Sequence, residues 1–301
     1  MTERIIHGVL LLIMPPLLIG VINKTKAWFA GRNGPPLLQP YYDLAKLLQK
    51  GIVLSSTTTW IFRFAPAVAL AAVVLAGLLV PINRFDAPIA FAGDVILFAY
   101  LFALARFFTT AAALDTGSAF EGMGASREVT FACLTEPALL FALLVLARIS
   151  GSLTLTGMLH GPEHGFGQAA APLTLVALGL FIVLLAESSR IPVDDPNTHL
   201  ELTMIHEVMV LDHSGPLFGA ILYGAAMKMF VLGAVLLHVV APFTAGPAWL
   251  GWLQFVGGML GLAVVIGIVE SVMARLQMPR VPYLLVGAML LCAFGFLLLV
   301  R

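Results

Sequence analysis

Long apolar segments constrain the fold of this chain more than any other feature of its sequence. A helix needs about 20 mostly apolar residues to cross a hydrocarbon layer of roughly 30 Å, and eight such segments recur along the 301 residues. With 60% hydrophobic and 11% charged residues, the chain carries more apolar surface than a soluble core buries. We therefore predict an all-α integral membrane protein with a single membrane domain over residues 1–301. The spans are expected near residues 5–23, 64–83, 93–114, 129–149, 172–188, 216–240, 249–272 and 281–300.

Basic residues predict which side of the membrane each loop faces. Six lie between the first and second spans and two precede the last span: Lys24, Lys26, Arg32, Lys46, Lys50, Arg63, Arg275 and Arg280. The positive-inside rule places such loops in the cytoplasm. The cytoplasmic loops are then 24–63, 115–128, 189–215 and 273–280, and both termini face outward from the cytoplasmic (inner) membrane. The first apolar segment lacks a small-residue cleavage site, so we expect a span rather than a signal peptide.

The sequence carries no motif of a metal, nucleotide or hydrolytic site. The two cysteines, Cys133 and Cys292, fall inside apolar segments and form no CxxC pair for zinc or an iron–sulfur cluster. A GxGxxG loop, a Walker A lysine motif and a nucleophile elbow are also missing. We therefore assign no catalytic and no metal-binding residue to this chain, and any energy source must be a partner.

Residues 187–216 gather acids and histidines between two apolar spans. Six of the chain's sixteen acids lie here: Glu187, Asp194, Asp195, Glu201, Glu207 and Asp212. Asp195-Pro196 is typical of a helix start and Gly215-Pro216 of a helix stop. On one continuous helix, His199, His206 and His213 would share a face, yet lie about 10 Å apart, too far to share one metal ion. A proton relay or a partner contact is our hypothesis for the histidines, and a solvated polar loop is the alternative.

Two glutamates one loop earlier can face the same side of a helix. Glu128 and Glu136 are eight residues apart, about 80° around a helix, and Glu136 falls within the fourth apolar segment. An ionised carboxylate at membrane depth costs at least a few kcal/mol, so it pairs with a cation or keeps its proton. We predict a proton or ion path here. Carboxylates held by Arg106, Arg127 or Lys228 for packing alone are the alternative.

Four segments that follow one another along nearly the whole chain carry a family resemblance. They are GRNGPPLLQPYYDLAKLLQK (31–50), ARFFTTAAALDTGSAFEGMGASRE (105–128), ESSRIPVDDPNTHLELTMIHEVMVLDHSGP (187–216) and ESVMARLQMPR (270–280). Together they resemble the subunit-one family of respiratory complex I. Within that family they are most similar to the branch found in membrane-bound, energy-converting nickel–iron hydrogenases of the formate hydrogenlyase and hydrogenase-4 type.

The resemblance implies roles for individual residues. The first loop matches the family's signature at Arg32, Gly34, Pro35 and Gln39, which are expected to help dock a peripheral redox module. An amphipathic surface helix should follow, and its apolar residues do recur at helical spacing: Tyr41, Leu44, Leu47 and Leu48. The family's acid chain, leading from the redox junction into the membrane, corresponds to Glu136, Glu187, Glu201 and Asp212. Together with Glu128 and Glu207, these residues form the proton or ion path that we predict. Its expected charge partners are Arg127 and Arg190, which match family motifs, and Lys228.

The implied function is that of a membrane subunit that anchors the peripheral module and couples its turnover to proton or sodium movement. The implied partners are hydrogenase large and small subunits, antiporter-like membrane subunits and the lipid bilayer, with no nucleic acid. Iron–sulfur clusters and a nickel–iron centre are expected in partner subunits, and no cofactor on this chain. Residues 194–215 are longer and richer in histidine than in complex I, which argues against carrying quinone binding over. The alternatives are a quinone-chamber subunit of an NADH-quinone oxidoreductase, a stand-alone secondary transporter and an inert structural anchor.

Overall fold

Eight helices in the described parts of the chain are long and apolar enough to cross a membrane. The computed structural model describes residues 2–83, 85–160, 166–194, 204–241 and 247–300, and no β-strand lies within these ranges. The predicted all-α membrane fold is therefore confirmed. The elements are α1 (Thr2–Phe29), α2 (Gln39–Gln49), α3 (Trp60–Leu79), α4 (Asp94–Asp115), α5 (Ala119–Ser150), α6 (Leu155–His160), α7 (Phe166–Glu187), the 3₁₀ helix η2 (Glu207–Val210), α8 (Gly215–Val240), α9 (Ala248–Val272), the 3₁₀ helix η3 (Met278–Arg280) and α10 (Val281–Val300).

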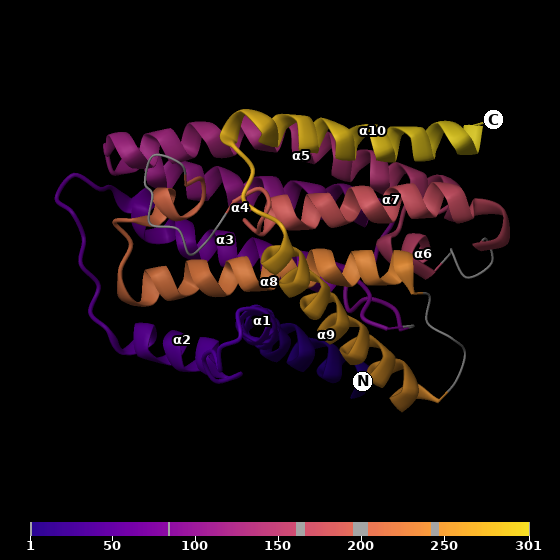
Figure 1. The fold of residues 1–301 in the computed structure, drawn as a ribbon, viewed down its shortest axis with the longest axis horizontal. Helices are drawn as coiled ribbons and strands as arrows, with labels where there is room; N and C mark the ends of the chain where they lie inside the picture. The colour runs from indigo at the N-terminus through magenta and orange to yellow at the C-terminus, as the bar shows by residue number, and fades with distance from the viewer. Residues whose placement is uncertain (1, 84, 161–165, 195–203, 242–246, 301) are drawn as a thin grey trace.

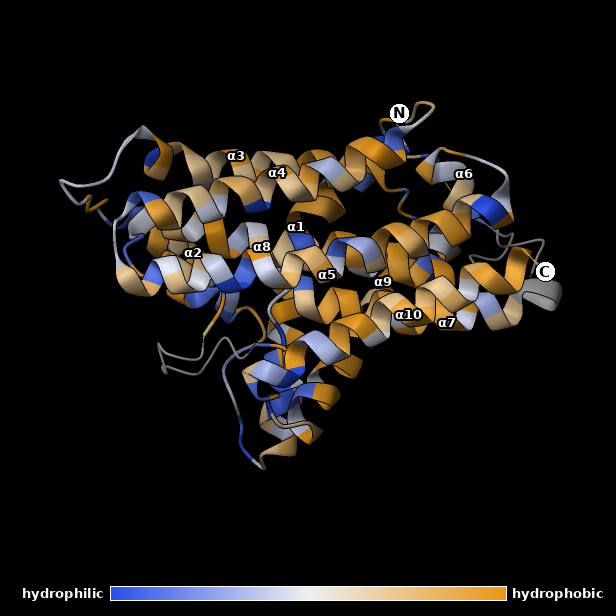
Figure 2. Ribbon diagram, turned by 90° about the horizontal axis from the view of Figure 1, so that it is seen from above, coloured by the Kyte–Doolittle hydropathy of each residue, from blue (hydrophilic) through white to orange (hydrophobic). Residues whose placement is uncertain are grey.

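Helix α8 forms the centre of the bundle. It packs against α1, α2, α3, α7 and α9, and almost every residue of its second half is buried. Figure 1 shows α5, α7 and α10 together on one side of α8 and α1 and α2 on the other, with α9 crossing in front of α8. Mostly apolar residues cover the long helices (Figure 2). Lipid is as apolar as these side chains, so close van der Waals packing holds the helices together rather than the hydrophobic effect.

The short helix α2 occupies the position expected for the amphipathic helix. None of its residues is buried, and it lies beside α8 and α1. The hydroxyl of Tyr41 donates a hydrogen bond to the carbonyl oxygen of Ile13 on α1. The segment after α2 leads to α3. At the start of α3, the backbone N–H groups of Thr59 and Phe62 donate hydrogen bonds to the carboxylate of Asp115, the last residue of α4, at 2.7 and 3.3 Å. These bonds satisfy free N–H groups at the start of α3 and fix it to the end of α4.

Three sequence-based boundaries are wrong. Helix α5 begins at Ala119 and not near 129, so most of the expected loop 115–128 is helical; its polar first turns escape a search for apolar residues. Gly215-Pro216 begins α8 instead of ending a helix, because proline fits the first turn of a helix. A continuous helix from 195 to 215 does not form, since residues 204–214 contain only the four-residue η2. His199, Glu201 and the pair at 195–196 lie outside the described residues.

Candidate functional site

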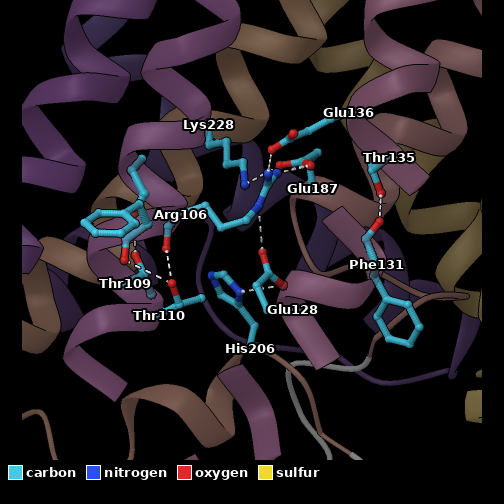
Figure 3. A network of polar contacts seen from close by, with 12 residues as sticks. Arg106, Thr109, Thr110, Glu128, Phe131, Thr135, Glu136, Glu187, His206 and Lys228 are labelled. Carbon is cyan, nitrogen blue, oxygen red and sulfur yellow. Dashed lines mark hydrogen bonds and ion pairs between the residues drawn. The ribbon is translucent and has the colours of Figure 1, made fainter. Parts of the chain in front are cut away.

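Arg106 lies at the centre of a buried ion cluster between four spanning helices. Helix α4 supplies Arg106, α5 supplies two glutamates, α7 ends at the third, and α8 supplies a lysine. Figure 3 shows the arginine side chain pointing into the space between these helices, with the carboxylates arranged around its guanidinium group. The cluster consists of Arg106, Glu128, Glu136, Glu187 and Lys228, with His206 beside it.

The guanidinium of Arg106 contacts a separate carboxylate through each of its three nitrogens. Nε lies 3.3 Å from Oε1 of Glu128, Nη1 bonds to Glu136 and Nη2 bonds to Glu187. Nζ of Lys228 lies 2.5 Å from Oε2 of Glu187. Glu128 and Glu136 therefore do face one sector of α5, as their spacing indicates, and α4 supplies the arginine that joins them.

The charges of the cluster do not balance. Arg106 and Lys228 contribute two positive charges and the three glutamates three negative ones, which leaves one excess negative charge when every group is ionised. The side chains of Arg106 and Glu187 are each 7% exposed. An uncompensated charge in buried surroundings costs several kcal/mol. Of the three carboxylates, Glu136 is the most exposed, with 47% of its side chain accessible.

His206 reaches the cluster from the segment that precedes α8. Its Nδ1 lies 3.9 Å from Oε2 of Glu128. Asp194 fixes this segment by accepting hydrogen bonds from the backbone N–H groups of Ile205 (3.2 Å) and His206 (3.1 Å). The segment also presses against Gly124 of α5, where a Cβ atom would lie 2.4 Å from Cγ1 of Val208. A glycine at this position is therefore needed for His206 to approach α5.

A second ion cluster joins α1 and α9 to the residues after α7. The carboxylate of Glu270, whose side chain is fully buried, binds Nζ of Lys26 at 2.8 Å and Nη1 of Arg190 at 3.3 Å. Asp194 pairs with Nη2 of Arg275 at 2.9 Å. Arg190 was expected to be a charge partner of the acid chain, but its ion pair here is with Glu270. These contacts hold the end of α1 and the end of α9 to the residues that follow α7.

The remaining predicted site residues are spread around the cluster. Arg127 donates a hydrogen bond from Nη1 to the carbonyl oxygen of Met204 at 2.9 Å. Glu207 is half-buried and lines a cavity between α1, α2 and α8. Asp212 is exposed and donates its backbone N–H to Glu121 at 3.1 Å. His213 stacks on Phe62 with ring centroids 3.9 Å apart. None of these contacts joins the Arg106 cluster.

The predicted docking residues lie between α1 and α2. Arg32, Gly34 and Pro35 are exposed. Gly34 has a φ of +62°, and a Cβ there would lie 2.3 Å from Cβ of Ala27, so both backbone and space require glycine. Gln39 donates a hydrogen bond to Asp43 within α2 at 2.8 Å. The signature residues Gly34 and Gln39 thus shape the turn and the start of α2.

Three cavities share lining residues at the cluster and at His206. A chamber of about 290 Å³ lies between α1, α2, α8 and residues 188–194 and 206–207, and His206 lines it. His206 also lines a small cavity that contains Arg106, Glu128 and Lys228. Arg106 lines in turn an apolar groove of about 430 Å³ between α4 and α5, together with Glu136 and Glu187. The side chain of Glu136 is 47% exposed in this groove, so the cluster has one approach on each side.

The central position of Arg106 in the ion cluster and the ion pairs of Glu270 were not predicted from the sequence. Both are ionisable residues within long apolar segments, which is itself a signal of function at membrane depth. Their partners come from helices distant in sequence, so the pairing could not be derived from spacing. Among the described residues, no group of three or more His, Cys, Asp or Glu side chains could hold a metal ion.

The fold and the buried ion cluster define a multi-pass membrane protein with a charged centre inside its helical bundle. Residues 3–301 match the family model described as NADH dehydrogenase. The chain belongs to the NADH dehydrogenase subunit 1 family, and the family predicted from the sequence motifs is confirmed.

Its relatives are subunits of membrane complexes. The chain is 31% identical over 284 residues to formate hydrogenlyase subunit 4 of Escherichia coli (strain K12), covering 92% of each chain. It is 33% identical over 239 residues to hydrogenase-4 component C of the same organism, covering 79% of this chain and 74% of the other. An NADH-quinone oxidoreductase subunit of Paraburkholderia xenovorans (strain LB400) is 26% identical, with 93% and 82% covered.

A solved structure shares the fold. A chain of the membrane-bound sulfane sulfur reductase, an archaeal respiratory membrane complex, superposes with a TM-score of 0.84 and is 20% identical. The match covers 99% of this chain and 98% of the other.

Proposed function

We propose that this chain is the membrane subunit of an energy-converting hydrogenase complex, where it couples electron transfer in a peripheral module to proton or sodium translocation. The relatives that are 31% and 33% identical are subunits of formate hydrogenlyase and hydrogenase-4, which supports the hydrogenase branch. The observation that carries the coupling role is the excess negative charge of the buried Arg106 cluster.

The cluster can respond to a change of charge at the redox junction. Its ionised form has one carboxylate too many, so a small change in the surrounding field decides whether one proton is bound. His206 lines both the chamber and the small cavity, Glu128 lines the small cavity, and Glu136 faces the groove between α4 and α5. A proton can enter through His206 and Glu128, pass among the carboxylates around Arg106, and leave at Glu136. In this proposal Glu201, Glu207 and Asp212 belong to the entry side.

The groove at Glu136 supports a contact with a neighbouring membrane subunit. A half-exposed carboxylate facing lipid is costly, and a second membrane protein with a polar acceptor at this depth removes that cost. We assign this face to the antiporter-like subunits. The cytoplasmic face, with α2, is assigned to the large and small hydrogenase subunits. Nickel–iron and iron–sulfur centres belong to those partners. The complex lies in the cytoplasmic membrane, with both termini of this chain outside.

The continuous helices favour a coupling subunit over a stand-alone secondary transporter. Transporters of that kind commonly place their ion sites at interrupted helices in repeated halves. Over the described residues, each of the long helices that supply the cluster is continuous, including α5 with its internal Pro137. The ions of the cluster are held by side chains rather than by unwound backbone.

Neutralising the glutamates separately tests the proposal. Glu136→Gln and Glu201→Gln keep the size of the side chain and remove the titratable proton. Reduction of an artificial dye by the peripheral module should stay near the wild-type rate, whereas ion pumping should fall about tenfold or more. Equal loss of both activities would indicate misassembly or a direct redox role. Full retention of both would leave the cluster as an inert structural anchor.

A quinone-binding subunit is the second candidate, because the relative from Paraburkholderia xenovorans is an NADH-quinone oxidoreductase subunit. The chamber between α1, α2 and α8 has an apolar side formed by Ile19, Leu44 and Met229. Half of its sixteen lining residues are polar or charged, however, whereas pockets for apolar ligands have few polar groups. Met229→Trp should obstruct the chamber. Loss of quinone-dependent turnover in this variant, with hydrogen-dependent dye reduction intact, would favour the second candidate.

A further inference from the structure

A groove between α1 and α9 lies outside the proposed coupling path. Its volume is about 480 Å³, and it shares no lining residue with the chamber or with the cavities around Arg106. Its walls are formed by the last turns of α1 from Val21 onward, by residues that follow α1, and by Val264 and Ile268 of α9. The two helices touch beside it, where a Cβ atom on Gly267 would lie 2.7 Å from Cβ of Thr25.

The charge within this groove is of one sign. Ten residues line it, among them two cations, Lys24 and Arg32, and no acid. Nζ of Lys24 donates a hydrogen bond to the carbonyl oxygen of Asn33 at 2.6 Å, which leaves further ammonium hydrogens available. Within the described parts of the chain, neither cation forms an ion pair with a carboxylate. The groove therefore offers two positive charges to an anion.

The groove also changes from polar to apolar along its length. Val21 of α1 and Val264 and Ile268 of α9 form its apolar part, and both α9 residues are exposed. At the polar end, Trp28 and Phe29 lie edge to face with ring centroids 5.2 Å apart, and Trp28 is 76% exposed. Exposed aromatic rings at the end of a spanning helix are typical of the membrane–water interface.

We propose that this groove binds an anionic phospholipid. The phosphate diester is held by Lys24 and Arg32, and an acyl chain runs along the apolar residues of α1 and α9. Basic pockets between spanning helices on the cytoplasmic side bind lipid headgroups in this way. The combination of unpaired cations, an interfacial tryptophan and an apolar extension fits a lipid better than a soluble protein. It assigns Arg32 to the membrane rather than to docking of the peripheral module.

The bound lipid stabilises a contact that the structure already contains. Lys26, two residues from Lys24, pairs with the buried Glu270 of α9 at 2.8 Å. A lipid that fills the groove between the same two helices holds them in the relative position that this pair requires. The proposal does not depend on the coupling role, because a lipid site of this kind is equally compatible with the quinone-binding alternative.

Lipid retention by the purified complex provides the test. The complex is extracted in mild detergent, stripped of lipid and titrated with deuterated phosphatidylglycerol or phosphatidylcholine, and bound lipid is counted by native mass spectrometry. We expect the wild-type complex to retain phosphatidylglycerol preferentially. Each basic side chain near an anionic lipid strengthens binding about fivefold, so Lys24→Gln with Arg32→Gln should weaken retention about 25-fold. Lys46→Gln, which removes an exposed lysine of α2 outside the groove, is the matched control.

The other outcomes overturn the proposal. Equal retention of both lipids, or unchanged phosphatidylglycerol retention in the double variant, excludes the site, as does displacement of the lipid by inorganic phosphate. Release of the soluble subunits by Arg32→Gln with normal lipid retention would return Arg32 to the docking role. If the double variant fails to assemble, Lys24→Gln alone must show about fivefold weaker retention, and an unchanged value contradicts the proposal.

Discussion

Nδ1 of His206 lies 3.9 Å from Oε2 of Glu128, so a histidine from the segment before α8 reaches a carboxylate inside the bundle. Glu128 in turn bonds to Arg106, and Arg106 bonds to Glu136 on the side of the α4–α5 groove. Four residues thus connect the chamber to the membrane-facing groove, and each of the three glutamate and histidine side chains can carry a proton.

His206→Gln should change the pH profile of coupled turnover. Imidazole is a common proton relay, and glutamine keeps a polar group while removing it. The rate of hydrogen-linked ion movement, measured from pH 5 to 9, should follow a pH profile that differs from that of wild type. His213→Gln serves as the control because His213 lies on Phe62, away from the cluster. A profile identical to wild type in the His206 variant would show that His206 relays no proton.

Lys228→Met should destabilise the protein by about 3–5 kcal/mol, the typical effect of removing one partner of a buried ion pair. The variant raises the excess negative charge of the cluster from one to two. Adding Glu187→Gln restores the original excess, so the double variant should recover most of the loss. Thermal unfolding in detergent measures the stability of the single and the double variant. If Glu187→Gln lowers the stability of the Lys228→Met variant further instead of restoring it, the excess charge does not determine the stability of the cluster.

Gly124→Ala should displace the segment that carries His206. The new Cβ would lie 2.4 Å from Cγ1 of Val208 and 2.9 Å from Cγ of Met209, so residues 204–210 must shift. Gly122→Ala is a matched control two residues away, where nothing lies within 4 Å of the added atom. We expect faster proteolysis near residue 206 and lower coupled turnover in the first variant alone. Equal behaviour of both variants would exclude this packing role.

His213 makes the stability of the protein sensitive to acid. Burial lowers the pKa of His213 to about 4, below the ordinary value of about 6.5. The folded protein therefore binds fewer protons than the unfolded chain between these values, and the stabilisation, complete above pH 6.5, is lost as pH falls toward 4. His213→Phe keeps a ring against Phe62 and removes the titration. Its unfolding temperature should drop less between pH 7.5 and 5 than that of wild type, and an equal drop would argue against the assignment.

Apolar length and motif spacing predicted the membrane fold, because a helix that crosses lipid must be continuous and apolar over about 20 residues. The same signal misplaced the start of α5, since the first turns of this helix carry polar residues that an apolar pattern does not reveal. Glu121, for example, is fully buried and accepts the N–H of Asp212. Periodicity also failed for the histidines, where Asp194 and Gly124 hold the chain in a non-helical path. Contacts between segments distant in sequence determine both the start of α5 and the path of the segment that carries His206 and His213.

Counting ions per turnover tests the coupling role of the Arg106 cluster most directly. The complex is reconstituted into liposomes with pH-sensitive and sodium-sensitive dyes, and ions moved per hydrogen molecule are compared for wild type, Glu136→Gln and Glu121→Gln. Both glutamates lie on α5, but only Glu136 contacts Arg106 in the described contacts. We predict that the ratio falls about tenfold or more in Glu136→Gln and stays near wild type in Glu121→Gln, with uncoupled dye reduction preserved in both. A wild-type ratio in Glu136→Gln would contradict the account.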